Sequence, residues 1–167
     1  MRACRILGML APVSEPFVVL PGQGRVLDMG SFAVSVLADG AATSSGFAVL
    51  ETHGEGTGFG PPMHVHRDAA EAFYVLEGTY QMYFENREEL APAGTFVYVP
   101  QHAPHTFKLV SEGYGRKLNI FSPAAMVGFF EQLSEAESRG EATLELLGQI
   151  AERHEMEIVG PVPDTYL

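Results

Sequence analysis

The chain has 167 residues, of which 46% are hydrophobic and 19% charged, a balance that fits one globular domain with an apolar core. Its 21 acidic and 10 basic residues give a net charge of −11, which argues against nucleic acid or an anionic membrane as a partner, because both require a basic surface. No apolar run approaches the roughly 18 residues of a membrane span. The single cysteine, Cys4, excludes an intramolecular disulfide, and the N-terminus lacks a clear signal-peptide cleavage site, so we expect a cytoplasmic protein.

Residues 1–122 are predicted to form a β-barrel. Residues 1–13 are expected to be a mobile arm or a first strand. Beyond them, short β-prone runs recur between Gly and Pro residues, and none shows helical periodicity. Many short strands at this spacing are typical of a sandwich or a barrel. The predicted strands cover residues 16–20, 31–37, 46–51, 71–77, 79–85, 95–99, 105–110 and 117–121.

The pattern changes to helical at Ser122-Pro123. Pro123 fits the first position of a helix and Ser122 the cap before it, so a helix is predicted over residues 124–138. Gly140 separates it from a second helix over residues 141–155, and the tail that follows is extended. We therefore predict that residues 123–167 are a helical extension packed on the barrel within the same domain. The predicted apolar face of the second helix comprises Leu144, Leu147, Ile150 and Ala151.

Two histidines and a glutamate are spaced as metal ligands within residues 58–78, GFGPPMHVHRDAAEAFYVLEG. Residues i and i+2 of a strand share a face, so His64 and His66 can converge on one ion. A four-residue connection of hairpin length then leads to Glu71. Side chains on neighbouring strands lie about 5 Å apart, so we expect Glu71 on the return strand to reach the same ion.

His105 supplies a fourth ligand from a later strand. Pro104 favours an extended backbone before it, and alternation along residues 105–110 places His105, Phe107 and Leu109 on the apolar inner face. Each of the four candidate ligands alone could be a surface or core residue. Together, several titratable groups on an inner face are costly to bury without a partner.

Three imidazoles and one carboxylate suit a single divalent transition metal per chain, whether Fe, Mn, Ni, Co, Cu or Zn. A structural zinc site is usually closed by cysteines, and here the only cysteine is remote in sequence. Four protein ligands around an octahedral ion leave two positions open for water, dioxygen or a substrate oxygen.

At these residues the chain resembles the cupin superfamily. The first cupin motif, G(x)5HxH(x)3-4E(x)6G, is matched at every position, and the second, G(x)5PxG(x)2H(x)3N, is matched at three. The second motif departs at His102, where glycine is usual, and at Leu109, where asparagine is usual. Neither position is a metal ligand in the family. The matched positions are Gly58, His64, His66, Glu71 and Gly78 in the first motif and Gly94, Pro100 and His105 in the second.

The resemblance implies a double-stranded β-helix, or jelly-roll barrel, over residues 1–122, with metal motifs at 58–78 and 94–109 and a short α-helical C-terminal extension. It also implies a homodimer and a metal bound by His64, His66, Glu71 and His105. The strand spacing and the downstream helix resemble single-domain bacterial cupins similar to quercetin 2,3-dioxygenases. In such proteins the substrate binds the metal through a hydroxyl oxygen, and the motif glutamate, here Glu71, can act as the catalytic proton acceptor.

Residues of the inner barrel face are candidates for the substrate pocket. Phe73, Met82 and Phe107 are the predicted substrate contacts, although core packing explains the same positions. His53 lies in a glycine-rich stretch that we interpret as a surface loop or a lid over the barrel. His102 is a candidate for a residue that contacts His105.

Three functions remain open from the sequence. The first is a metal-dependent dioxygenase acting on a flavonol, polyphenol-like or enolic small molecule. The second is a non-catalytic cupin that binds a small molecule. The third is an oxygen-independent metalloenzyme, such as an isomerase, cyclase or decarboxylase.

Overall fold

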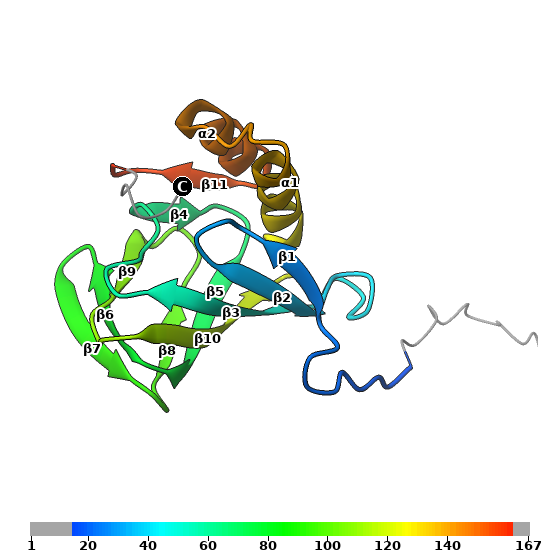
Figure 1. The fold of residues 1–167 in the computed structure, drawn as a ribbon, viewed down its shortest axis with the longest axis horizontal. Helices are drawn as coiled ribbons and strands as arrows, with labels where there is room; N and C mark the ends of the chain where they lie inside the picture. The colour runs from blue at the N-terminus through cyan, green and yellow to red at the C-terminus, as the bar shows by residue number, and fades with distance from the viewer. Residues whose placement is uncertain (1–14, 162–167) are drawn as a thin grey trace, which may run out of the picture.

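Two antiparallel sheets pack face to face in the computed structural model, which describes residues 15–161 (Figure 1). The six-stranded sheet has the order β1-β2-β3-β10-β5-β8, and the five-stranded sheet has the order β11-β4-β9-β6-β7. This confirms the predicted all-β barrel with C-terminal helices. The strands are β1 (Arg25–Asp28), β2 (Ala33–Ala38), β3 (Ala48–Gly56), β4 (His64–His66), β5 (Ala70–Glu77), β6 (Thr79–Phe84), β7 (Arg87–Pro92), β8 (Phe96–Val99), β9 (His105–Leu109), β10 (Tyr114–Ser122) and β11 (Met156–Ile158).

Alternation along each strand sends one set of side chains into the space between the sheets. In β5, Phe73 and Val75 are buried whereas Tyr74 is exposed, and in β6, Tyr80 and Met82 are buried. This confirms the parity predicted for β5 and β9 and shows that Met82 lies on the inner face of β6. Burial of these apolar side chains supplies the main favourable free energy of folding.

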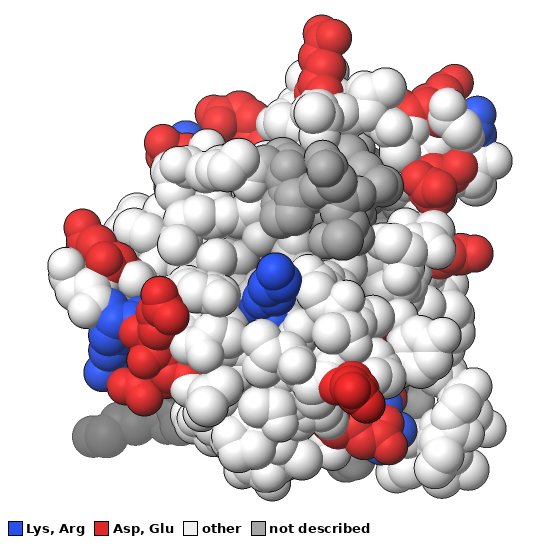
Figure 2. All heavy atoms as spheres, turned by 60° about the vertical axis from the view of Figure 1, so that its left-hand side comes forward, with Lys and Arg blue, Asp and Glu red and all other residues white. Residues whose placement is uncertain are grey.

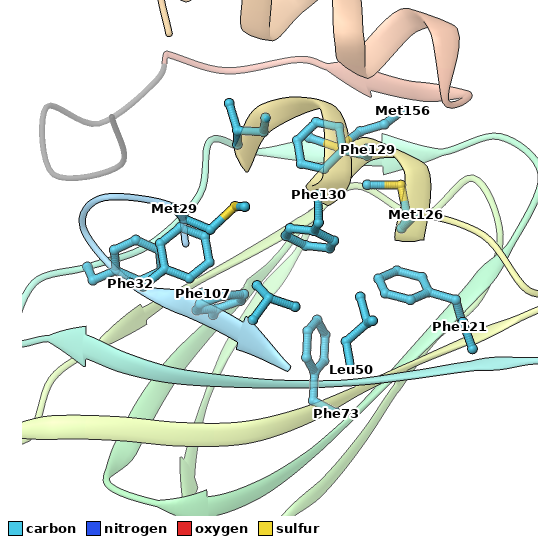
Figure 3. Packing of buried hydrophobic residues seen from close by; sticks show 14 of the residues in the cluster. Met29, Phe32, Leu50, Phe73, Phe107, Phe121, Met126, Phe129, Phe130 and Met156 are labelled. Carbon is cyan, nitrogen blue, oxygen red and sulfur yellow. The ribbon is translucent and has the colours of Figure 1, made fainter. Parts of the chain in front are cut away.

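The C-terminal extension closes one end of the barrel. Helices α1 (Val127–Ser138) and α2 (Leu144–Arg153) pack on it, and β11 adds an antiparallel strand to β4. Figure 3 shows Phe129, Phe130 and Met156 of this extension gathered at one end of the core, with Phe107 and Phe121 beneath them. The extension is therefore part of the barrel's core and of its second sheet.

The first helix begins later than predicted. Ser122 is the last residue of β10, the Ser122-Pro123 peptide bond is cis, and α1 begins at Val127 with Met126 as its N-cap. Met126 has a φ of 65°, so the chain turns sharply after Pro123 before the helix can start. The predicted cap and first position at Ser122 and Pro123 were therefore wrong.

The second helix follows the prediction more closely. The side chain of Thr143 caps α2 by accepting a hydrogen bond from the Leu146 backbone N–H, and Gly140, with a φ of 66°, lies in the turn between the helices. Leu147 is fully buried, but Leu144 is 63% exposed, which corrects its predicted place on the packed face.

Some strand predictions failed for lack of a pairing partner. Residues 16–20 are exposed and form no strand, despite their β-prone composition. Conversely, β1, β7 and β11 were not predicted, and each forms by pairing with a neighbouring strand. The arm expected at residues 1–13, Cys4 and the last six residues of the tail lie outside the described residues. Within residues 15–161, neither helix has the length and apolar character needed to cross a membrane.

Charged groups are mainly on the surface. On the face shown in Figure 2, acidic side chains lie mostly toward the edges, and a basic side chain stands near the centre among uncharged residues.

We predict that Leu147→Ala lowers the free energy of unfolding by about 2–5 kcal/mol, because it leaves a cavity between α2 and the barrel. Leu144→Ala, on the same helix but exposed, should change it by less than about 0.5 kcal/mol. Urea denaturation followed by circular dichroism measures both. Equal effects of the two substitutions would show that α2 does not pack as described.

Candidate metal centre

The four predicted ligands meet inside the barrel. One ligand atom from each of His64, His66, Glu71 and His105 lies within 4.8 Å of the others, and all four residues are buried. His64 and His66 come from β4, and His64 is paired in register with His105 of β9. The structure therefore brings together the full set of residues expected from the sequence.

Glu71 reaches the histidines from the opposite sheet. It lies in β5, whose neighbours are β10 and β8, whereas β4 and β9 belong to the other sheet. Residues 67–69 therefore cross between the sheets and do not form the predicted hairpin. Glu71 faces the histidines across the barrel interior, so the closure of the barrel determines the spacing of the ligands.

Backbone carbonyls orient two of the imidazoles. Nδ1 of His64 lies 2.8 Å from the carbonyl oxygen of Pro62, and Nδ1 of His105 lies 2.9 Å from that of Ala103. Because a carbonyl only accepts, both Nδ1 atoms carry the proton, and Nε2 is left as the inward-facing atom. The same arrangement orients histidine ligands in metal sites.

Two imidazoles converge on one oxygen of Glu71. Nε2 of His66 and Nε2 of His105 each lie 3.0 Å from Glu71 Oε2. Nδ1 of His66 is buried and has no hydrogen-bond partner among the described residues. These contacts concentrate nitrogen and oxygen donors around one small volume.

The protonation states suit a cation. Burial, reinforced by the charges of His105 and His66, lowers the pKa of His64 to about 3, so this imidazole is neutral at pH 7. Burial alone would raise the pKa of Glu71, but hydrogen bonds from His105 and His66 and their charge outweigh it and hold that pKa well below its usual range. A neutral imidazole, as at His64, and an ionised carboxylate, as at Glu71, are metal-binding forms, and a bound metal would displace the protons between Glu71 and the other two histidines, so the donor set fits one divalent transition metal.

Asn119 is a contributor that the sequence analysis missed. Its Nδ2 donates to Glu71 Oε1 at 3.0 Å, which fixes the carboxylate so that Oε2 faces the histidines. Asn119 lies on β10, which pairs with β5, and is buried. The available signal was the strand KLNIF, in which alternation places Lys117, Asn119 and Phe121 on one face.

A small cavity of about 40 Å³ opens directly onto the ligands. Its walls combine the metal-ligand residues His64, His66 and Glu71 with aromatic and methionine side chains from the barrel and the C-terminal extension. Of the three predicted substrate contacts, Phe107 lines the cavity, whereas Phe73 and Met82 are buried in the core and do not line it. The lining residues are Phe32, Thr52, Glu55, Phe59, Pro61, His64, His66, Glu71, Phe107, Lys117, Asn119, Phe121, Met126, Phe129, Phe130 and Met156.

The two remaining histidines within the barrel region take other positions. His53 lies inside β3, with Nε2 3.2 Å from the Ser35 hydroxyl, so the loop and lid interpretations were wrong. His102 is exposed, and its backbone N–H donates to the carbonyl oxygen of His66 at 2.9 Å. With a φ of 67°, it has the left-handed backbone for which glycine is favoured.

Comparisons with known proteins agree with this architecture. Residues 51–121 match the family model described as "Cupin domain". Over 119 residues, the chain is 28% identical to the quercetin 2,3-dioxygenase of Bacillus subtilis (strain 168), which covers 68% of this chain. The match covers only 35% of that curated relative, about a third of its length.

Solved structures share the fold. An RmlC-like cupin from Shewanella frigidimarina NCIMB 400 has a TM-score of 0.56 and 23% identity, over 66% of this chain and 93% of that one. The polyketide cyclase RemF from Streptomyces resistomycificus has a TM-score of 0.55 and 19% identity, over 65% of this chain and 80% of that one. At these identities the likeness establishes the double-stranded β-helix and no shared activity.

We predict that His105→Ala removes most of the Co²⁺ or Zn²⁺ bound after equilibrium dialysis, because it deletes one of four convergent ligands. His53→Ala, a histidine substitution away from the cluster, should leave the bound metal unchanged. Elemental analysis measures both. Unchanged metal content in the His105 variant would contradict the assignment of the site.

We predict that Asn119→Ala weakens metal affinity about 10–100-fold, since the Glu71 carboxylate loses the group that orients it. Asn86→Ala, at an exposed position, is the matched control. Competition with a chromophoric chelator gives both affinities. Equal affinities would mean that Asn119 has no orienting role.

Proposed function

Because this chain is a cupin-superfamily protein with a cupin domain at residues 51–121 and resembles quercetinase-like proteins, we propose that it is a metal-dependent dioxygenase of flavonols, polyphenols or related enolic small molecules. The observation that carries this proposal is that the buried ligand cluster opens into an apolar cavity within the barrel. A cluster with no adjoining cavity would instead favour a purely structural ion.

The walls of the cavity favour a planar, largely apolar substrate. Phe107, Phe121 and Phe129 contribute aromatic faces, and Met126 and Met156 contribute flexible thioethers. Aromatic rings stack or pack edge to face on such walls. The same side chains exclude bulk water from the ligand cluster, which strengthens electrostatic interactions there.

The metal ion and the Glu71 carboxylate would have different roles in the reaction. A bound divalent ion would supply Lewis acidity for ionising an enolic hydroxyl and a site for dioxygen activation. Asn119 positions the Glu71 carboxylate at its Oε1 atom, and we assign this carboxylate as the acceptor of the hydroxyl proton. His64 and His105 stay fixed by their carbonyl contacts while that proton moves.

The homodimer implied by the family resemblance and the small-molecule substrate belong to the same proposal. The 28% identity to the quercetin 2,3-dioxygenase, over part of that protein, supports the reaction class but does not identify the substrate or the metal.

We predict that protein loaded with Fe²⁺, Mn²⁺, Ni²⁺ or Co²⁺ consumes one dioxygen per flavonol, measured with an oxygen electrode and by loss of flavonol absorbance. The metal-free protein and the His105→Ala variant should lose at least about 100-fold of this rate, because the ligand cluster is incomplete.

Two other results would contradict the dioxygenase proposal. Equal conversion under anaerobic conditions would identify an oxygen-independent metalloenzyme. Tight binding of flavonols without conversion, with every metal tested, would identify a binding protein.

A further inference from the structure

A second buried polar cluster lies in the same cavity as the metal ligands. It contains Lys117, Glu55, Thr52 and Tyr80, none of them more than 2% exposed. Lys117, Glu55 and Thr52 line the cavity together with His64, His66 and Glu71. The roles assigned to the metal ligands and Asn119 in the proposed reaction involve none of these four residues.

A β-bulge brings Glu55 into the barrel. Thr52 and His53 of β3 pair with Lys117 and Arg116 of β10, but the next pair joins Glu55 to Gly115, so Gly54 has no partner across the ladder. Gly54 is exposed and has a φ of 81°. The extra residue reverses the alternation, so that Glu55 points inward although the residue two positions before it, His53, does not. Bulges commonly redirect side chains next to binding sites in this way.

The ammonium of Lys117 is held at the cavity wall by two hydrogen bonds. It donates to Glu55 Oε1 and, at 2.8 Å, to the hydroxyl of Thr52. It also lies 4.0 Å from the ring centroid of Phe107, an aromatic wall of the cavity. Because an ammonium has three donors, these two hydrogen bonds leave one for a further acceptor.

Glu55 has a separate anchor and so does not depend on Lys117 alone. The hydroxyl of Tyr80 donates to Glu55 Oε2. Burial lowers the pKa of Lys117, while the charge and hydrogen bond of Glu55 oppose that shift and favour the ammonium form. Burial has the larger effect on this pKa, and the ion pair with Glu55 holds the Lys117 nitrogen in a defined place.

The buried pair is poorly explained by stability alone. Removing two charges from water costs free energy that their attraction often fails to recover, and an apolar pair of similar volume is frequently as stable. In addition, two carboxylates, Glu55 and Glu71, would stand against Lys117 and a divalent ion, because imidazoles bind a metal in their neutral form. The metal-bound cavity then has one net positive charge and would favour a monoanion.

Resting on the proposed function, we propose that Lys117 is a substrate-binding residue that donates its third N–H to an ionised enol or phenol oxygen of an aromatic substrate. The substrate is thereby bound at two points, by the metal centre and by Lys117. Glu55 is a positioning residue, since it holds the Lys117 ammonium. Its negative charge also repels the ionised substrate oxygen and so limits the affinity for the substrate.

Quercetin binding tests this proposal in the full-length, metal-loaded protein under anaerobic conditions. Flavone, which has no hydroxyl group, is the control probe. The variants are E55Q, the double variant E55Q/K117M, which removes both charges together, and R116M, which removes an outward-facing cation on the same strand. Metal content and thermal unfolding are measured for each variant to establish that the site and the fold are intact.

We expect E55Q to bind quercetin at least about 3-fold more tightly than the unsubstituted protein, and E55Q/K117M to bind at least about 10-fold more weakly than E55Q. Flavone affinity should change less than about 2-fold throughout, and R116M should bind quercetin within about 2-fold of the unsubstituted protein. If Glu55 and Lys117 served only stability, E55Q would not raise the affinity for quercetin while the added K117M substitution lowered it.

Equal quercetin affinity of E55Q and E55Q/K117M would overturn the role of Lys117, as would an equal loss of flavone affinity. Oxygen uptake by the same samples in air separates this result from the proposed function. If the unsubstituted protein binds quercetin without taking up oxygen, the dioxygenase proposal fails while the affinity ratio still decides the role of Lys117. If it binds no quercetin, both proposals are contradicted.

Discussion

The site depends on the contacts of the buried Glu71 carboxylate. Its Oε2 atom lies against His66 and His105, and its Oε1 atom accepts a hydrogen bond from Asn119. An ionised carboxylate inside a barrel is costly unless its charge and lone pairs are satisfied. Its partners come from β4, β9 and β10, while Glu71 itself lies on β5. Both sheets must therefore be assembled in register before this charge is stabilised.

The C-terminal extension is tied to that same assembly. Strand β11 pairs with the strand that carries His64 and His66, with Met156 opposite His66. Met126 at the start of α1 and Met156 also line the cavity. The extension thus supports the metal-ligand strand from its edge and shapes the space in which a substrate would lie, so it belongs to the site as well as to the fold.

The metal ligands could be predicted from sequence because strand alternation is local. His64 and His66 share a face by spacing alone. His105 is predicted to face inward because it shares its side of the strand with the apolar residues Phe107 and Leu109. The sheet that holds Glu71 could not be predicted, since a four-residue connection fits either a hairpin or a crossing between sheets.

Features that depend on distant pairing were missed for a similar reason. Glu55 is turned inward by a bulge whose register is defined by β10, so parity counted along β3 assigns it to the wrong face. β11 has only three residues and exists because it pairs with β4. The late start of α1 follows from the turn at Met126, for which the Ser-Pro sequence before it gave a misleading capping signal.

The central claim is that one metal ion is held by side chains from both sheets. An anomalous difference map from crystals of the Co²⁺-loaded protein, recorded on either side of the cobalt absorption edge, tests it most directly. We expect one strong peak per chain, within coordinating distance of the His64, His66 and His105 imidazoles and of Glu71. A peak elsewhere, or one contacted by the histidines of β4 without Glu71 and His105, would contradict it.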